Sequence, residues 1–257
     1  MDELVLREDV KPGLVRLRLN RPDAFNALSE AMLAALKLKL RQLAADDQVK
    51  VVILAASGKA YCAGHDLKEM RSQPSQAYYE TLFKTCSEVM LAVQQLPQPV
   101  IAEVQGVATA AGCQLVAMCD LAVAADTAQF AVSGVNLGLF CATPSVALSR
   151  NISRKQAMYM LLTGEFIDAH QALDWGLLNF VAPHAELAAM TEGLADSILA
   201  KPMPALRLGK KLFYEQIETQ ISRAYELAGQ TMACNMMDDT ALEGVQAFID
   251  KRPPNWS

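Results

Sequence analysis

The sequence predicts an α/β core followed by a helical C-terminal region. Short apolar runs typical of buried strands alternate with amphipathic helical segments up to about residue 143, and a helical period dominates from there on. The chain has 257 residues, of which 52% are hydrophobic and 20% charged, which is enough for one large domain with a sizeable core. We therefore expect a core over residues 1–195 and a helical region over residues 196–257.

Each element of the core carries its own local signal. Apolar and polar residues alternate at 14–19, as in a strand with one buried face, and Ser29 is a good N-cap for the helix that follows. A continuous apolar run, typical of a strand covered on both faces, occurs at 51–54, and further strands are expected at 100–104 and 121–125. Helical periodicity predicts helices at 76–95 and from Cys113, then at 144–162, 168–174, 185–199, 203–218, 220–235 and 239–250.

Charge and composition exclude several classes of protein. The net charge of −5 argues against nucleic acid as the main partner, because phosphate binding needs a basic surface. The most apolar stretch, 100–125, contains Glu103, Gln105, Gln114 and Asp120, so no membrane span is expected. The six cysteines form no Cys-x-x-Cys pair, and the acidic N-terminal segment lacks the features of a targeting peptide. We therefore expect a cytoplasmic protein.

Several common catalytic motifs are absent from the sequence. It contains no Gly-x-Gly-x-x-Gly after a strand, no Walker phosphate loop, no His-Glu-x-x-His and no Gly-x-Ser-x-Gly. The three histidines, His65, His170 and His184, are too few and too far apart to predict a multi-histidine metal site.

Two loops rich in small residues are the candidates for chemistry. One spans 57–69 and the other 106–112, and each directly follows a predicted buried strand, where open α/β folds bind their ligands. A pair of backbone N–H donors, one from each loop, would stabilise an oxyanion or enolate, and the helix that begins near Gly112 would add its partial positive charge. On spacing alone, tight packing between strands and helices is the favoured interpretation of both loops.

Four segments in the same order resemble the crotonase (enoyl-CoA hydratase/isomerase) superfamily. They are Leu19–Ser29, Cys62–Glu69, Ala110–Leu115 with Met118–Asp120, and Ala247–Trp256. The resemblance covers nearly the whole chain. It implies a crotonase spiral of βαβ units in which the C-terminal helices build trimers, usually paired into hexamers.

The same resemblance implies an acyl-CoA substrate and assigns roles to individual residues. The oxyanion hole would be the backbone N–H groups of His65 and Ala111. The coenzyme A part of the substrate would contact Ala24, Asn26, His65, Asp66, Leu67 and Lys68, with Phe248 and Lys251 reaching the CoA bound to a neighbouring subunit. No metal and no redox cofactor is implied.

The sequence departs from the family at both acid/base positions. Hydratases of this family use two glutamates, and the matching residues here are Gln114 and Gly134. Loss of one general base typically costs about 10²–10⁴-fold in rate, so ordinary hydration should be severely weakened.

The departures leave hydration, double-bond isomerisation and decarboxylation open, together with a non-catalytic acyl-CoA-binding or regulatory protein. The Gly64-His65-Asp66 run is similar to that of the family's methylmalonyl-CoA decarboxylases, which carry a tyrosine where this sequence has Cys141. Cys141 borders the expected acyl pocket as either a catalytic group or a buried apolar thiol. Gln114 either orients a water or the thioester, or is a satisfied structural amide.

Overall fold

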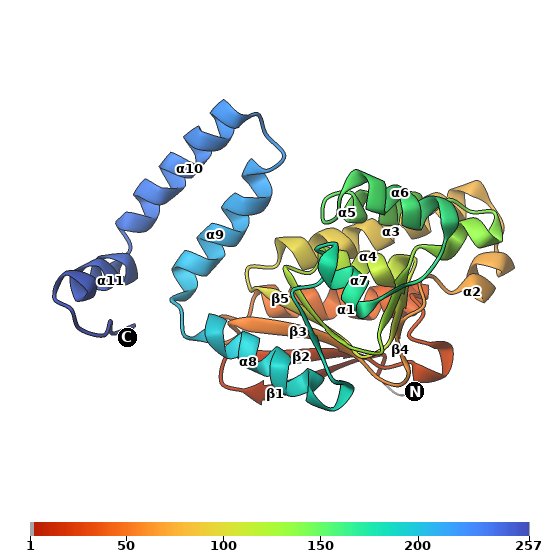
Figure 1. The fold of residues 1–257 in the computed structure, drawn as a ribbon, viewed down its shortest axis with the longest axis horizontal. Helices are drawn as coiled ribbons and strands as arrows, with labels where there is room; N and C mark the ends of the chain where they lie inside the picture. Colours follow the sequence, from red (N-terminus) through yellow and green to blue (C-terminus); the bar gives the residue numbers. More distant parts are fainter. Residues whose placement is uncertain (1–2, 257) are drawn as a thin grey trace.

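The computed structural model describes residues 3–256, which form two β-sheets flanked by helices (Figure 1). The larger sheet has the strand order β1 (Val5–Lys11), β2 (Leu14–Leu19), β3 (Val51–Ala56), β5 (Val100–Val104), β7 (Leu121–Ala125) and β10 (Phe180–Ala182). The smaller sheet has the order β4 (Ala60–Cys62), β6 (Val107–Thr109), β8 (Gln129–Ala131) and β9 (Ile167–Asp168). All neighbouring strands are parallel except the pairs β1–β2 and β8–β9.

Helices cover both faces of the larger sheet, which explains its continuous apolar strands. Val52 and Leu54 of β3 belong to the main core, to which α1 (Glu30–Ala44), α3 (Gln76–Gln95) and α4 (Ala111–Met118) also contribute. Val51 and Ile53 of the same strand point to the opposite face, into a second cluster closed by α8 (Leu187–Leu199). The predicted α/β architecture and the strands at 51–54, 100–104 and 121–125 are therefore confirmed.

Serine side chains cap the first turns of the two long helices α1 and α3. The Ser29 hydroxyl accepts a hydrogen bond from the Met32 N–H at 3.1 Å, which satisfies one of the free N–H groups at the start of α1. Ser75 does the same for α3 through the Tyr78 N–H at 3.3 Å, and α3 spans the predicted range 76–95. The remaining helices of the body are α2 (Leu67–Ser72), α5 (Ala142–Leu148), α6 (Arg154–Thr163) and α7 (Ala169–Asp174).

The single helix predicted at 144–162 is wrong, because the chain forms α5 and α6 there instead. Ser153 and Gln156 form a capping box that starts α6 afresh. The helix expected from Cys113 begins two residues earlier, at Ala111. The strands β4, β6, β8, β9 and β10 were not predicted, since two or three residues are too few to show a period.

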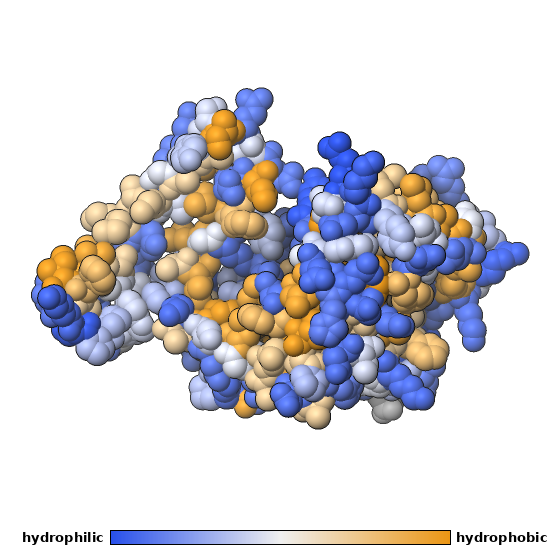
Figure 2. Space-filling view, viewed as in Figure 1, coloured by the Kyte–Doolittle hydropathy of each residue, from blue (hydrophilic) through white to orange (hydrophobic). Residues whose placement is uncertain are grey.

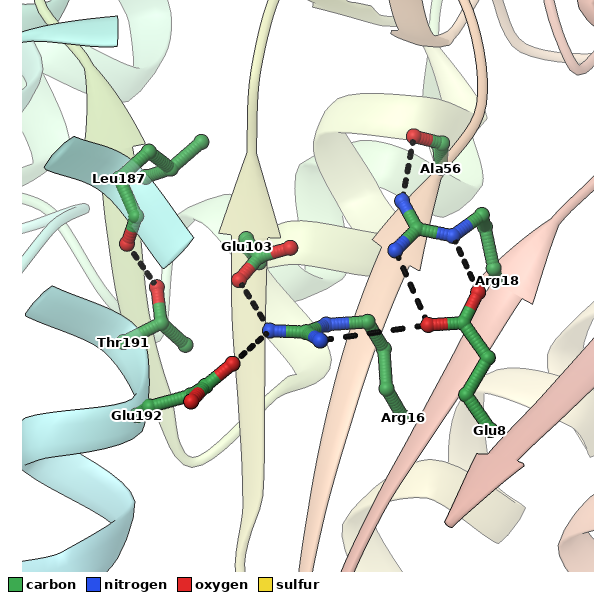
Figure 3. A network of polar contacts seen from close by, with 8 residues as sticks. All are labelled: Glu8, Arg16, Arg18, Ala56, Glu103, Leu187, Thr191 and Glu192. Atoms are coloured by element: carbon green, nitrogen blue, oxygen red, sulfur yellow. Dashed lines mark hydrogen bonds and ion pairs between the residues drawn. The ribbon is translucent and has the colours of Figure 1, made fainter. Parts of the chain in front are cut away.

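Buried charges link the sheet to α8 on its second face (Figure 3). The Arg16 guanidinium lies 3.0 Å from the carboxylate of Glu103 on β5 and 3.0 Å from that of Glu192 on α8. The side chains of Arg16 and Glu103 are each only 8% exposed, and Glu8 on β1 lies 3.9 Å from Arg16 while also pairing with Arg18. These contacts join β1, β2, β5 and α8, so the pairing within this group fixes the position of α8 on the sheet.

The last three helices, α9 (Met203–Gln216), α10 (Ile221–Met236) and α11 (Asp239–Ile249), stand away from the body as an arm (Figure 1). Lys210 of α9 ties the arm to the body through Asp120, with Nζ 2.6 Å from the carboxylate, and the Tyr214 hydroxyl donates to the same side chain at 2.9 Å. The predicted boundary between residues 195 and 196 falls inside α8, which packs on the sheet and continues to Leu199, so the body extends to that residue.

Many large apolar side chains of the arm are exposed in the single chain. Figure 2 shows apolar residues along the C-terminal helices and between them and the body. They include Phe213, Ile217, Ile221, Tyr225, Met232, Met236, Met237, Leu242, Val245, Phe248 and Ile249. Between residues 3 and 256, no helix has both the length and the apolar character needed to cross a bilayer.

Candidate active site

A cavity of about 300 Å³ lies where the two loops predicted from the sequence meet. The loop after β4 contributes Ala63 and His65, and the loop after β6 contributes Ala110 and Ala111. The remaining lining residues come from α2, α3 and the segment 133–144, and they are Leu67, Met70, Phe83, Ser133, Gly134, Leu137, Leu139, Phe140, Cys141, Ala142, Thr143 and Pro144. The lining is therefore mostly apolar, as is typical of a site for a small acyl group.

Strand pairing brings the two loops together. β4 and β6 are neighbouring parallel strands, with Cys62 beside Ala108, so both loops leave the same edge of the smaller sheet. Gly64 permits the close approach: its φ is +89°, and a Cβ built there would lie 2.9 Å from the Ala110 Cβ and 3.4 Å from the Ala111 nitrogen. A side chain at this position would push the two loops apart.

Two backbone N–H groups at this junction have no acceptor. Neither the N–H of His65 nor that of Ala111 donates a hydrogen bond to another group within residues 3–256. Ala111 is the first residue of α4, so the positive end of the helix dipole adds to its N–H. Ala110 before it has a φ of +50°, which is unfavourable for a residue with a Cβ. This backbone conformation holds the start of α4 against Gly64.

The imidazole of His65 faces the cavity without a hydrogen-bond partner. Its ring meets that of Phe83 edge-on, with the ring centroids 5.4 Å apart. Both ring nitrogens are buried and have no partner within residues 3–256. Burial lowers the pKa of His65 below its ordinary value, so the ring is mainly neutral at pH 7 and offers one donor and one acceptor.

The structure separates the two residues that match the family's glutamates. Gln114 on α4 is 5% exposed, its Oε1 has no partner within residues 3–256, and it is not part of the cavity lining. Gly134 does line the cavity, but a Cβ built there would lie 2.5 Å from the Leu139 carbonyl oxygen and 2.7 Å from the Cys141 Sγ. A glutamate therefore cannot be placed at 134 unless the segment 137–141 moves.

The predicted coenzyme A segments lie side by side. The Ala63 N–H donates to the Phe25 carbonyl at 3.0 Å and the Leu28 N–H to the Gly64 carbonyl at 2.7 Å, which brings Ala24 and Asn26 next to the segment 65–68. Leu67 and Lys68 are exposed there. The Asn26 side chain is fully buried and already bonded, accepting from the Arg21 N–H and donating to the carbonyls of Ser57 and Ala60, each at 2.8 Å. The Asn26 side chain thus holds the loop in shape.

The two predicted residues of the C-terminus lie outside the cavity. Phe248 on α11 is 84% exposed, and Lys251 follows that helix with a φ of +56°. Neither belongs to the cavity lining of the same chain. A contact with bound CoA would have to be made in another subunit, as the resemblance implies.

Sequence reasoning missed the side chains that shape the cavity. Met70 of α2 and Phe83 of α3 form one wall, and Leu137, Leu139 and Phe140 form another. The signal for Phe83 was present, because it lies on the inward face of the predicted helix 76–95, yet nothing in the period distinguishes a core position from a cavity position. Within residues 3–256, no cluster of three or more His, Cys, Asp or Glu side chains is arranged to hold a metal ion.

The close contact between α4 and β4 predicts that a side chain at residue 112 destabilises the protein. A Cβ at Gly112 would lie 2.0 Å from the Cys62 carbonyl oxygen, so Gly112→Ala forces the two loops apart. We expect a loss of about 1–3 kcal/mol in the free energy of unfolding, as for an overpacked core, measured by urea titration. Gly229→Ala in α10 is the matched control, because nothing lies within 4 Å of that position, and it should stabilise the chain by about 0.5–1 kcal/mol. Equal stability of the two variants would contradict this account of the junction.

Asp66 is predicted to make stability depend on pH. Its carboxylate caps α2 and lies 2.8 Å from Arg21, which holds the pKa of Asp66 below its usual 3.8. A lowered folded pKa gives stability that is present above pH 3.8 and lost as the pH falls through the folded value. Asp66→Asn should therefore cost about 1 kcal/mol at pH 7, and this difference should shrink below pH 3.8 when unfolding is measured at both pH values. A difference that does not change with pH would rule the ion pair out as its source.

Comparison with known proteins places these features in a family. The family model described as enoyl-CoA hydratase/isomerase matches residues 9–257. The mouse mitochondrial enoyl-CoA hydratase domain-containing protein 3 is 45% identical over 245 residues, which are 95% of this chain and 82% of the mouse protein. This similarity confirms the resemblance read from the sequence.

Solved structures agree over the whole fold. An enoyl-CoA hydratase of Mycobacterium smegmatis superposes with a TM-score of 0.98 at 61% identity, covering 99% of both chains. The human enoyl-CoA hydratase domain-containing protein 3 gives a TM-score of 0.94 at 44% identity, covering 98% of this chain and 100% of the human one. The crotonase fold with its C-terminal helices is therefore confirmed.

The same comparison corrects the expected location. The mouse, rat and human relatives are named as mitochondrial proteins, which contradicts the cytoplasmic location predicted from the sequence. That prediction rested on the absence of Cys-x-x-Cys pairs and of a recognisable targeting peptide, and these two observations do not determine the location of a protein. The match over residues 9–257 and the agreement of the folds have one common explanation: the chain belongs to the enoyl-CoA hydratase/isomerase family.

Proposed function

We propose that this protein is an enzyme that binds an acyl-CoA thioester and stabilises its enolate with the backbone N–H groups of His65 and Ala111. The observation that carries this proposal is the pair of unbonded N–H groups at the edge of an apolar cavity of about 300 Å³. Such preorganised donors are often the largest single contribution to catalysis of thioester chemistry. The CoA moiety is part of the substrate, and the reaction needs no further cofactor.

The reaction follows an unusual course for this family. No Asp or Glu among residues 3–256 lines the cavity, so a carboxylate cannot activate a water or remove an α-proton there. We therefore expect hydration to be weak and place isomerisation and decarboxylation beside it as candidate reactions. All three pass through charge on the thioester oxygen, which is what the two N–H groups can stabilise.

A mixed incubation tests the proposal. Crotonyl-, 3-enoyl-, methylmalonyl- and saturated acyl-CoA thioesters are incubated together with the protein, and the products are separated by chromatography and identified by mass. A gain of water, a shifted retention at constant mass, or a loss of carbon dioxide each identifies one reaction. Turnover of at least one thioester is the expected result.

The absence of a carboxylate in the cavity also favours a second function, in which the protein binds acyl-CoA without turning it over. No change in any thioester, together with saturable binding of CoA compounds, would support that function and overturn the first. Turnover at the rate of ordinary family members would exclude the second. Restoring both glutamates, Gln114→Glu with Gly134→Glu, is a poor test, because residue 134 has no room for a side chain.

The exposed apolar side chains of α9–α11 support a homotrimer, alone or paired into a hexamer. An assembly would cover residues such as Phe213, Ile221 and Phe248, which one chain leaves exposed. In such an assembly, Phe248 and Lys251 can approach a ligand that another subunit binds. Light scattering of the purified protein distinguishes these states.

A further inference from the structure

An ammonium group of the arm is buried against the body. Lys210 Nζ on α9 lies 2.6 Å from the Asp120 carboxylate. It also donates to the carbonyl oxygens of Gln98 at 3.0 Å and Val93 at 3.4 Å. Each of the three ammonium hydrogens therefore has an acceptor. The side chains of Lys210 and Asp120 are only 9% and 15% exposed, so either charge alone would be costly at this place.

The three acceptors lie where α3 and α4 end. Val93 belongs to the last turn of α3 and Gln98 follows that helix, while Asp120 follows the C-cap of α4. The dipole of a helix favours a cation at its C-terminal end and disfavours an anion there. The Asp120 carboxylate therefore depends on the Lys210 ammonium group to remain buried beside the end of α4.

Asp120 in turn anchors the end of α4 to the larger sheet. Its Oδ2 accepts from the N–H of Val100, the first residue of β5, at 2.7 Å, and its own N–H donates to the Val100 carbonyl at 3.0 Å. The hydroxyl of Tyr214, also on α9, donates to Oδ1 at 2.9 Å. Without Lys210, an unpaired carboxylate would turn towards solvent and give up the bond from the Val100 N–H. The C-terminal end of α4 would then lose this anchor.

The opposite ends of the same two helices reach the cavity. Phe83 of α3 forms part of its wall, and α4 begins at Ala111, whose N–H is one of the two free donors. Residues 111–117 of α4 are all buried, and Gly112 lies against the Cys62 carbonyl. A displacement of the C-terminal end would tilt this short helix about that contact. The tilt would redirect the Ala111 N–H, and the strength of a hydrogen bond depends on that direction.

We propose, on the basis of the proposed function, that Lys210 is a positioning residue through which the arm aims the Ala111 N–H at the thioester oxygen. The ammonium group neutralises Asp120, Asp120 holds the end of α4, and α4 presents its first N–H to the cavity. Stabilisation of the enolate therefore depends on the docking of α9 on the body, at a place outside the cavity lining.

Infrared difference spectroscopy of the full-length protein tests the proposal without requiring turnover. A saturated acyl-CoA thioester labelled with carbon-13 at its carbonyl carbon is bound to each variant. Two aimed N–H donors weaken the C=O bond, so the wild type should lower its stretching frequency below that of the free thioester in water. In Lys210→Met the frequency should return towards the free value. The affinity for the thioester should fall about 2–30-fold, while the affinity for free CoA, which has no thioester oxygen, should stay unchanged.

Lys211→Met is the matched control, because Lys211 is the exposed next residue of α9 and the same chemical change is made there. It should keep the wild-type frequency and both wild-type affinities. A purely structural role of Lys210 would lower the free energy of unfolding but leave the frequency and the ratio of the two affinities unchanged in the folded protein. Thermal unfolding and light scattering of each variant establish that the compared samples are folded and of equal size.

The outcomes separate this proposal from the proposed function. A wild-type frequency and thioester affinity in folded Lys210→Met overturn the role of Lys210 and leave the proposed function intact. A bound thioester whose frequency the wild type does not lower overturns the proposed function itself. If Lys210→Met does not fold or assembles differently, Tyr214→Phe replaces it, since it removes only the 2.9 Å bond to Asp120. That variant should shift the frequency in the same direction by a smaller amount, and an unshifted frequency would overturn the proposal.

Discussion

Ala111→Pro is expected to lower kcat for any thioester that the protein turns over by about 10²–10³-fold. The substitution removes one of the two N–H donors, and loss of such a donor typically costs about 2.7–4 kcal/mol of transition-state stabilisation. Ala111 is the first residue of α4, a position where proline is tolerated because the N–H has no partner within the helix. The change removes the donor at a helical position that tolerates proline. However, Ala110 before it has φ +50° and ψ −120°, outside the extended region that a residue before proline adopts, so kcat is compared only in a variant that still unfolds cooperatively. Steady-state kinetics on the best substrate from the mixed incubation measures the effect.

Asp239→Pro is the matched control for that experiment. Asp239 is the exposed first residue of α11, so the same chemical change is made at the same helical position, remote from the cavity. It should leave kcat unchanged and unfold near the wild-type temperature, because Asp238 before it is already extended, as a residue before proline must be. Wild-type kcat in a folded Ala111→Pro variant would show that this N–H does not act in the reaction.

Arg16→Met should have the largest effect on stability. It leaves the Glu103 carboxylate, which is 8% exposed, without its partner at 3.0 Å. Breaking a buried ion pair from one side typically costs about 3–5 kcal/mol, because the remaining charge stays buried and unpaired. We expect that loss in the free energy of unfolding, measured by urea titration at one fixed protein concentration, since an assembly makes stability concentration-dependent.

Two further variants identify the cause of that loss. Arg16→Met combined with Glu103→Leu removes both charges and should recover most of the stability. Arg223→Met breaks the pair with Glu226, whose side chains are 56% and 62% exposed, and should cost less than about 1 kcal/mol. If Arg16→Met costs no more than Arg223→Met, the buried group does not fix α8 on the sheet as described.

Long elements with strong local signals could be predicted from the sequence. α1 and α3 have serine N-caps and several turns of apolar period, the strands β3 and β7 are continuous apolar runs, and β5 is apolar except for Glu103. The strands β4 and β6 could not be predicted, because three residues carry no period. Their existence depends on pairing between residues such as Ala60 and Val107, which are far apart in the chain. This is also why the sequence suggested the two loops but not the strand pair that joins them.

The candidate site was predictable where backbone geometry follows from small residues. Gly64 and Gly112 indicated close approach, and the structure brings His65 and Ala111 to one junction. The position of the Cys141 thiol beside Gly134 was not predictable, since it depends on how the segment 137–141 folds back through the bond from the Leu139 N–H. The internal hydrogen bonds of the Asn26 side chain were not predictable either, since they join residues from separate segments of the chain.

A crystal structure with a bound saturated acyl-CoA thioester tests the central claim most directly. We expect the thioester oxygen at about 2.7–3.1 Å from both the His65 and the Ala111 nitrogen, with the acyl chain in the cavity beside Phe83 and Cys141. A thioester oxygen that contacts neither nitrogen, with the acyl chain bound elsewhere, would contradict the account.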